Sequence, residues 1–436
     1  MNPALGVYGR MPRRSLVLAL SLAACSPSGG SDSDDTDAGT LGSSAADSTG
    51  PATDPTTTAS TGTSVDTSTD SAPTTTGDSD TGEAIDYNAP GPHIVANTRF
   101  MLTAGERSLQ VEVWYPADAT AAAAAAKGHP IAEFVPEGAD RVAFEGLLAK
   151  LSPAGQIGTR LQTSSALDGP LAAGGPFPLI VFSHCHSCTR FSAFSVAEHL
   201  ASHGFIVAAP DHTGNTLFNE LAGDTAAIGE DFLKVRRADL GAVLDAMLDP
   251  LGPAIPASLR GQSDPTRVGA LGHSFGAASV GRLAQEDPRV RAAMPIAAPI
   301  ENPFFPGNKL ADIHVPLLAI LAEEDNSIGA LGNGLIESNF QSANPPIRLL
   351  RLRDAGHWNF TDICGLTDGF SPGCGEGVRQ TVPGEAFTYL DIDIGRGIAR
   401  AYAVAFFDRY LRDGQSAAAY LDAPDPADVV TVEVRE

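Results

Sequence analysis

The sequence is poor in positive charge. It holds 28 Lys and Arg against 52 Asp and Glu in 436 residues, which gives a formal net charge of −24. Nothing along the chain concentrates Lys and Arg, which a nucleic-acid surface needs in order to neutralise phosphates. The deficit is largest over residues 26–88, which contain many Asp and neither Lys nor Arg. We therefore expect no nucleic-acid partner, and we assign much of the acidity to that one segment.

A hydrophobic run long enough to cross a bilayer is missing from the N-terminus. The apolar stretch at residues 15–22 is only eight residues long, and a spanning helix needs about 20. It follows three arginines, Arg10, Arg13 and Arg14, and leads into small residues. A positive start, a short apolar core and small residues are typical of a signal peptide, which we predict over residues 1–24.

The end of this segment, Leu22-Ala23-Ala24-Cys25, resembles a bacterial lipoprotein signal. In such signals the Cys thiol takes a diacylglycerol group, and several lipid chains on Cys25 would anchor the chain in the cell envelope. The Ser26 that follows, in place of Asp, favours the outer membrane. The alternative is an ordinary signal peptide with an incidental cysteine.

Large apolar residues are almost absent from residues 25–88, which consist mainly of Ser, Thr, Asp, Gly, Pro and Ala. Such a segment cannot bury enough surface to offset the entropy of ordering, so we predict a disordered linker. The composition changes near residue 91, and we assign residues 89–436 to one catalytic domain.

Strand and helix patterns alternate through this domain. A half-buried strand is expected at residues 109–115, and an irregular insertion with a helix near 143–151 follows at 119–175. Apolar runs predict buried strands at residues 177–183, 204–210, 268–271, 290–296, 315–321 and 347–352. Helices are expected at residues 194–202, 230–248 and 399–411, and after residue 274. This alternation predicts an α/β fold with a mostly parallel central sheet and helices on both faces.

Residues 272–276, Gly-His-Ser-Phe-Gly, lie between one of these strands and an Ala-rich helical run. This arrangement predicts a sharp strand–turn–helix that projects the Ser274 hydroxyl from the top of the sheet. Glycine fits at 272 and 276 because a side chain there would collide with neighbouring backbone. We predict Ser274 as a nucleophile.

An acid and a base follow Ser274 at the ends of two later strands. Asp325 follows the strand at 315–321, and His357 follows the strand at 347–352. The order Ser, acid, His is that of α/β-hydrolases, in which the imidazole activates the hydroxyl and the carboxylate orients the imidazole. Glu324 and Glu301 remain alternatives for the acid.

Two backbone N–H groups are predicted to hold the oxyanion. One is that of Phe275, at the start of the helix after the nucleophile. For the other we choose His186, in the loop after the strand at 177–183.

Three segments resemble platelet-activating factor acetylhydrolase and related dienelactone-hydrolase-like esterases. They are residues 177–184 (FPLIVFSH), 200–209 (LASHGFIVAA) and 272–276 (GHSFG). The resemblance implies an α/β-hydrolase that cleaves carboxylic esters without a metal or cofactor. This chain departs from the family at Cys185, where the family has Gly. No carboxylate directly follows the strand at 290–296, where the acetylhydrolase carries its acid, and this favours Asp325.

Cysteine is scarce, with five residues in all. If Cys25 is lipidated, four remain, and in an exported protein they suggest disulfides Cys364–Cys374 and Cys185–Cys188. The Cys-x-x-Cys spacing of the second pair also occurs in thiol-redox sites. Zinc binding by this crowded loop is the weakest alternative, because its donors can hardly surround one ion.

Together these features predict an exported, lipid-anchored serine ester hydrolase acting on short-chain or lipid-like esters, with no metal. A binding protein that kept the fold and lost the chemistry, or a thiol oxidoreductase, are the alternatives. The sequence leaves the acyl and alcohol groups and the oligomeric state open.

Overall fold

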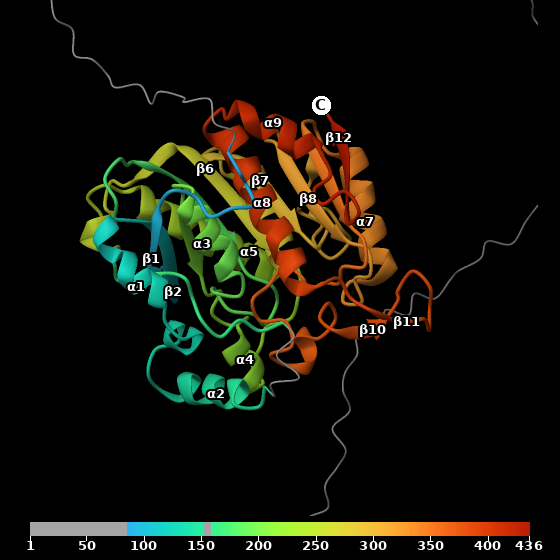
Figure 1. Cartoon of the computed structure of the whole chain (residues 1–436), viewed down its shortest axis with the longest axis horizontal. Coiled ribbons are helices and arrows are strands. Elements are labelled where there is room, and N and C mark those ends of the chain that lie inside the picture. Colours follow the sequence, from blue (N-terminus) through green and yellow to red (C-terminus); the bar gives the residue numbers. More distant parts are fainter. Residues whose placement is uncertain (1–84, 152–157) are drawn as a thin grey trace, which may run out of the picture. The chain divides into compact units, whose positions relative to one another are not determined.

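The computed structural model describes residues 85–151 and 158–436 (Figure 1). The predicted signal peptide, Cys25 and nearly all of the predicted linker lie outside the described residues. Within the described residues, no helix combines the length and apolar character needed to cross a membrane.

A ten-stranded mixed sheet forms the centre of the molecule, in the order β12-β9-β8-β7-β6-β4-β5-β2-β1-β3. The strands are β1 (Ile94–Ala104), β2 (Arg107–Ala117), β3 (Ala166–Leu167), β4 (Phe177–Ser183), β5 (Ile206–Pro210), β6 (Ser263–His273), β7 (Val290–Ile296), β8 (Leu317–Ala322), β9 (Ile347–Leu352) and β12 (Val430–Arg435). Six neighbouring strands of the sheet pair in parallel, in the order β5, β4, β6, β7, β8 and β9. An antiparallel β1–β2 pair extends one side of the sheet, and antiparallel β12 closes the other.

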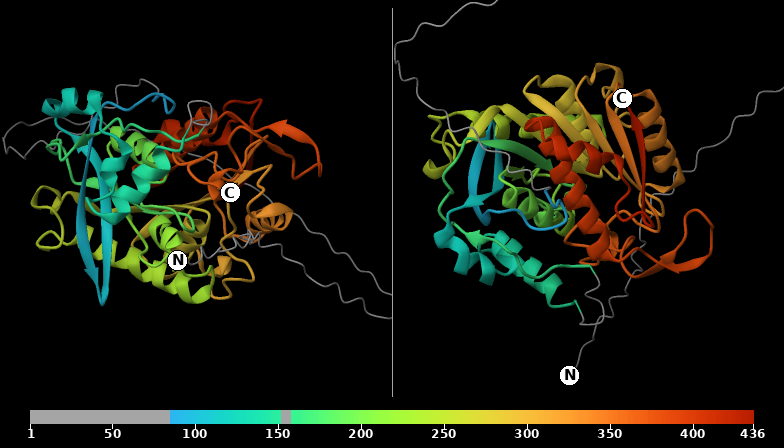
Figure 2. Two further views of the ribbon diagram at one scale, coloured as in Figure 1. Left: turned by 90° about the horizontal axis from the view of Figure 1, so that it is seen from below. Right: turned by 45° about the horizontal axis from the view of Figure 1, so that its top comes forward.

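Helices cover both faces of the sheet (Figures 1 and 2). The α-helices of the described residues are α1 (Ala122–Lys127), α2 (Ala139–Leu148), α3 (Phe194–Ser202), α4 (Leu217–Ala222), α5 (Glu230–Leu248), α6 (Phe275–Glu286), α7 (Gly329–Ser342), α8 (Ile392–Leu411) and α9 (Gln415–Asp422). A large buried apolar cluster lies on each face of the sheet. One cluster contains side chains of α3, α8 and α9, and the other contains side chains of α5, α6 and α7.

Strand β4 shows why both faces are apolar. All seven of its residues are buried. Ile180 and Phe182 point into the cluster beneath α3 and α8, whereas Leu179 and Val181 point into the cluster beneath α5 and α6. Because successive side chains alternate between the faces of a sheet, a strand covered on both faces must be apolar throughout. The α/β fold with a mostly parallel sheet is confirmed.

Several predicted boundaries differ from the structure. Helix α2 lies at Ala139–Leu148, a few residues before the predicted 143–151. Helix α8 begins at Ile392, seven residues before the predicted start at 399. The predicted start is late because Gly395 and Gly397 interrupt the apolar pattern in the first turns of the helix. Strand β12 and the small β10 (Glu376–Val378) and β11 (Ala386–Thr388) hairpin were not predicted.

Tyr87, which falls within the predicted linker, is part of the folded unit. Its side chain is only 2% exposed, and its hydroxyl hydrogen bonds with Asp408 and Ser416. Its ring packs against that of Tyr420, with centroids 5.0 Å apart. The folded unit therefore includes residues just before 89.

Candidate active site

Ser274 occupies the turn between β6 and α6. Its backbone has φ 57° and ψ −121°, a conformation that residues with side chains rarely adopt. A Cβ on Gly272 would collide with the carbonyl of Gly276, and a Cβ on Gly276 would collide with the carbonyl of Ser183. The Ser274 N–H donates to the carbonyl of Ile296 at 2.8 Å, which ties the turn to β7. The predicted sharp turn is present.

The structure brings together the three side chains that were predicted to form a triad. His357 Nε2 lies 2.8 Å from Ser274 Oγ, and His357 Nδ1 lies 2.7 Å from Asp325 Oδ2. A carboxylate can only accept, so Nδ1 carries the proton and Nε2 is left to accept from the serine hydroxyl. His357 and Asp325 are buried, whereas Ser274 is half-buried.

Of the three candidate carboxylates, only Asp325 contacts His357. Its second oxygen accepts from the N–H groups of Ser327 and Ile328, which fixes the carboxylate plane. Glu324 faces another way: it accepts from the Arg379 guanidinium, the Gln380 N–H, and the hydroxyl and N–H of Thr381. Burial alone would raise the pKa of Glu324, but these hydrogen bonds outweigh it and lower the pKa.

The remaining candidate, Glu301, is held away from the histidine. Its carboxylate pairs with Lys309 at 3.2 Å and accepts from the Leu310 N–H at 2.9 Å. The preference for Asp325 over Glu324 and Glu301 therefore agrees with the geometry.

The loop that carries His357 is braced by the segment that follows it. The Trp358 N–H donates to the Pro372 carbonyl at 3.2 Å. A Cβ on Gly356 would come within 2.5 Å of Gly373 Cα, so the two loops cross at glycine. The predicted Cys364–Cys374 disulfide closes this segment.

His273, the residue before Ser274, was missed by the sequence analysis. Its Nε2–H donates to the His357 carbonyl at 2.9 Å, and its ring lies 4.8 Å from that of His357 between centroids. Complete burial holds the pKa of His273 well below its usual range, so the ring stays neutral. The signal was its place within the pentapeptide, next to the nucleophile.

The predicted oxyanion loop follows β4 and contains the predicted Cys185–Cys188 disulfide. The His186 imidazole accepts from Asn215 Nδ2 at 2.7 Å through Nδ1. Within residues 85–151 and 158–436, the backbone N–H of His186 makes no hydrogen bond. The N–H of Phe275 is the first of α6 and has no partner within the helix.

The Cys185–Cys188 disulfide concerns the two alternative interpretations of this loop, a zinc site and a thiol-redox site. Both sulfurs of Cys185 and Cys188 are bonded to each other, and both residues are completely buried. Bonded sulfurs cannot serve as zinc thiolates, and burial removes the access that a thiol-exchange site needs. Among the described residues, no three or more His, Cys, Asp or Glu side chains are grouped to hold a metal ion.

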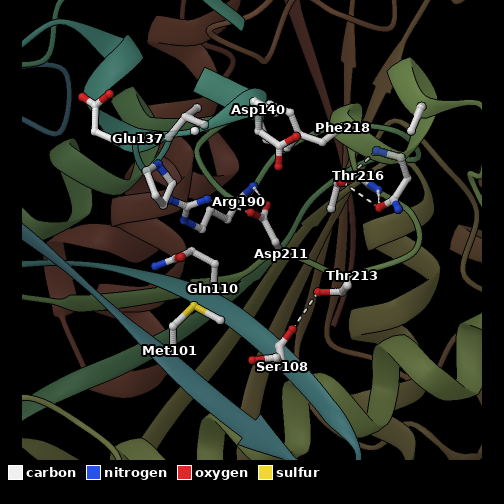
Figure 3. A pocket seen from close by; sticks show the side chains of 16 residues that line it. Met101, Ser108, Gln110, Glu137, Asp140, Arg190, Asp211, Thr213, Thr216 and Phe218 are labelled. Atoms are coloured by element: carbon white, nitrogen blue, oxygen red, sulfur yellow. Dashed lines mark hydrogen bonds and ion pairs between the residues drawn. The ribbon is translucent and has the colours of Figure 1, made fainter. Parts of the chain in front are cut away.

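A pocket of about 490 Å³ opens beside the loops that follow β4 and β5 (Figure 3). Arg190 and Asp211 lie at its centre, joined by an ion pair of 2.6 Å. The segment from Val135 to Asp140, within the predicted insertion, forms one wall, and Phe218 of α4 forms another. Ser274, His357, Phe275 and His186 are not among the residues that line this pocket.

Comparisons with known proteins find similarity to ester hydrolases. Residues 82–221 match the family of platelet-activating factor acetylhydrolase, isoform II, and residues 169–362 match the dienelactone hydrolase family. The chain is 23% identical to platelet-activating factor acetylhydrolase of Cavia porcellus over 359 residues, 74% of this chain and 77% of that protein. It is 34% identical to cutinase est2 of Thermobifida alba over 146 residues, 34% of this chain and 41% of the cutinase.

A solved structure extends the similarity to the whole fold. The ferulic acid esterase from Streptomyces cinnamoneus aligns with 80% of this chain and 98% of its own, at a TM-score of 0.56 and 25% identity. Fold, site geometry and relatives together define the class, so the chain is an α/β-hydrolase of the carboxylic ester hydrolase type. More particularly, parts of the chain are similar to the platelet-activating factor acetylhydrolase and dienelactone hydrolase families.

Proposed function

We propose that Ser274, His357 and Asp325 form the catalytic triad of this esterase. The observation that carries the proposal is the position of His357, whose two ring nitrogens bridge the Ser274 hydroxyl and the Asp325 carboxylate. Serine is a weak nucleophile until a neutral imidazole takes its proton, and this geometry supplies that imidazole in the required tautomer.

The reaction follows from these contacts. Ser274 Oγ attacks the ester carbonyl as His357 Nε2 takes the hydroxyl proton, and the Asp325 carboxylate stabilises the resulting imidazolium. The N–H groups of Phe275 and His186 hold the oxyanion of the tetrahedral intermediate. The imidazolium returns its proton to the leaving alkoxide, so an alcohol departs and an acyl-enzyme remains. Water, deprotonated by His357, then releases the acid and restores Ser274.

The substrates that fit this proposal are short-chain or lipid-like esters. The relatives include an acetylhydrolase, cutinases and a ferulic acid esterase. An acyl-chain series of p-nitrophenyl esters, a phospholipid with a short acyl chain, a feruloyl ester and an aliphatic polyester would separate these classes. A maximum of kcat/KM at short acyl chains would assign the short-chain class and a maximum at long chains the lipid-like class, whereas no hydrolysis of any of these esters would contradict the proposal.

Replacement of the nucleophile tests the triad directly. Ser274→Ala is expected to abolish hydrolysis of p-nitrophenyl acetate and labelling by a fluorophosphonate probe. Ser279→Ala is the matched control, since Ser279 lies on α6, the helix that follows Ser274, and its hydroxyl donates a hydrogen bond to the Phe275 carbonyl. A folded wild-type protein that is not labelled at Ser274 would favour a binding protein that has lost the chemistry.

We also propose that the chain is exported and held at the bacterial envelope, favouring the outer membrane, by lipid on Cys25. The support is the sequence Leu22-Ala23-Ala24-Cys25 followed by the polar segment to residue 88. Cys25→Ser is expected to move the esterase from the membrane fraction to the soluble fraction, and fractionation of cells that express this variant measures the change. An unchanged distribution would point to an ordinary signal peptide.

A further inference from the structure

A buried arginine lies beneath the oxyanion loop, outside the triad. Arg236, on α5, is completely buried, and its guanidinium is joined to the loop after β4 by two hydrogen bonds. Nη1 donates to the His184 carbonyl at 2.5 Å, and Nη2 donates to the Cys185 carbonyl at 3.0 Å. Burial lowers the pKa of Arg236 to about 9, so the group remains charged at pH 7.

The bond to the Cys185 carbonyl fixes a neighbouring donor. The carbonyl of Cys185 and the N–H of His186 belong to one peptide, and in a trans peptide the two point in opposite directions. The Cys185 carbonyl also accepts from His184 Nδ1 at 2.7 Å. Because the carbonyl is turned toward Arg236, the N–H of His186 is turned away from it and stays unpaired within the described chain.

The same guanidinium reaches the other oxyanion donor and the His186 side chain. Its central carbon lies 4.3 Å from the ring centroid of Phe275, whose N–H is the first of α6. Nη2 also donates to Asn215 Oδ1 at 2.5 Å, and Asn215 in turn donates to the imidazole of His186. One side chain therefore contacts both residues proposed to hold the oxyanion, directly or through Asn215.

A second buried network holds the start of the loop. His212 joins Asp239 and Ser183, with 3.0 Å from Nδ1 to Asp239 Oδ2 and 3.0 Å from Nε2 to Ser183 Oγ. The His212 N–H donates to His184 Nε2 at 3.0 Å. This Ser–His–Asp arrangement resembles a triad, but Ser183 and His212 are completely buried, so no substrate reaches it. Its effect is to fix the strand end from which the loop departs.

We infer that Arg236 is a positioning residue for ester hydrolysis: it sets the direction of the His186 N–H and supports Phe275, and thereby builds the oxyanion site in advance of substrate. This inference rests on the proposed function. The positioning requires a guanidinium, because its two terminal nitrogens donate to two backbone carbonyls and one side-chain amide oxygen at once. A lysine ammonium cannot reproduce that geometry.

The test compares Arg236→Met, Arg236→Lys and the control Arg237→Met. Arg237 is the next residue on α5, is partly exposed and pairs with Glu286. Arg236→Met is expected to lower kcat on p-nitrophenyl acetate by about 30–300-fold with KM changed less than about 3-fold, since an oxyanion donor acts in the transition state. Arg236→Lys should recover only part of this loss, and Arg237→Met should match the wild type.

A transition-state analogue separates positioning from a loss of stability. An alkyl trifluoromethyl ketone adds to the serine and places an oxyanion in the site, so its Ki should rise in proportion to the fall in kcat/KM across the Arg236 variants. The acid limb of the pH–kcat/KM profile should stay in place, because Arg236 does not contact His357. Full recovery with lysine would assign the effect to charge alone and overturn the inference.

If Arg236→Met does not fold, Asn215→Ala carries the same test, because it removes one acceptor of Arg236 and the donor to His186. A folded Arg236→Met or Asn215→Ala variant with wild-type kcat and wild-type affinity for the ketone would overturn the inference without contradicting the proposed triad. A wild-type protein without esterase activity or Ser274 labelling would instead overturn the proposed function, and this inference with it.

Discussion

At the scale of single residues, the neighbouring carboxylates Glu324 and Asp325 bind different partners. Both are buried at the end of β8. Asp325 turns toward His357, whereas Glu324 turns toward Arg379 and Thr381 and ties down the segment before β11. Both residues lie just beyond the end of β8, where the chain turns, and their side chains meet different partners.

Replacing each carboxylate by its amide should separate these roles. Asp325→Asn is expected to lower kcat on p-nitrophenyl acetate by roughly 10³–10⁴-fold, because the amide no longer fixes the imidazole tautomer or stabilises its cation. Glu324→Gln should lower kcat by less than about 10-fold and act mainly on thermal stability. Equal losses of kcat in the two variants would contradict the assignment of Asp325.

Glu198, on α3, gives a prediction for pH. Desolvation by complete burial raises the pKa of Glu198 to about 7. The folded protein therefore holds a proton that the unfolded chain releases above about pH 4.5, so this group's contribution to stability declines as pH rises toward 7. Glu198→Gln is neutral at every pH and can still accept from the Ser164 N–H.

The difference in stability between Glu198→Gln and the wild type should thus move in the variant's favour between pH 5 and pH 8. The expected change is on the order of 2–3 kcal/mol, at about 1.4 kcal/mol per pKa unit. Denaturant unfolding of both proteins in the same buffers measures it, and other titrating groups cancel in the difference. A difference that is flat or falls with pH would show that Glu198 ionises normally in the folded protein.

At the scale of elements, loops rather than helices and strands carry the site. The loop after β9 holds His357 and crosses the segment closed by Cys364–Cys374, where Gly356 meets Gly373. The loop after β4 holds His186 and is closed by Cys185–Cys188. Each disulfide therefore restrains one of the two loops that approach Ser274.

The two disulfides should differ in their effect on stability. The Cys364–Cys374 bond spans 10 residues and the Cys185–Cys188 bond spans 3, and a longer closed loop removes more entropy from the unfolded chain. The double variant Cys364→Ser/Cys374→Ser is expected to lose about 2–3 kcal/mol, more than Cys185→Ser/Cys188→Ser. Urea unfolding under oxidising conditions compares them, and the reverse order would contradict this reasoning.

At the scale of the whole molecule, the two ends of the folded unit hold each other. Tyr87 packs on α8 and α9, and the Tyr87 carbonyl accepts from His199 Nε2 at 2.9 Å. Asn88 donates to Asp425 at 3.0 Å, close to the start of β12. The segment that leads into β1 is thereby fastened to the C-terminal helices.

A protein that begins at residue 90 should be less stable than one that begins at residue 85, by roughly 2–4 kcal/mol, because a buried aromatic side chain and its hydrogen bonds are lost. Tyr87→Ala in the longer protein is the matched variant and should reproduce most of the loss. Thermal unfolding of the three proteins measures the effect. Equal midpoints would place the start of the folded unit after residue 88.

The sequence by itself determined the α/β class, because a strand covered on both faces must be apolar and a helix between strands must be amphipathic. Strands β4, β7 and β9 and helices α3 and α5 lie at their predicted positions. It also determined the nucleophile turn, since only glycine fits beside Ser274, and the order in which Ser274, Asp325 and His357 follow their strands.

Only the tertiary structure decided which carboxylate meets His357, where the folded unit begins, and what lies beneath the oxyanion loop. Strand β12 closes the sheet, and Arg236, Asn215 and His212 converge on one loop, although they come from α5 and from the segment after β5. These features depend on contacts between distant segments. A local pattern records whether a side chain is buried, whereas the partner that makes its burial tolerable is set by the packing of the whole chain.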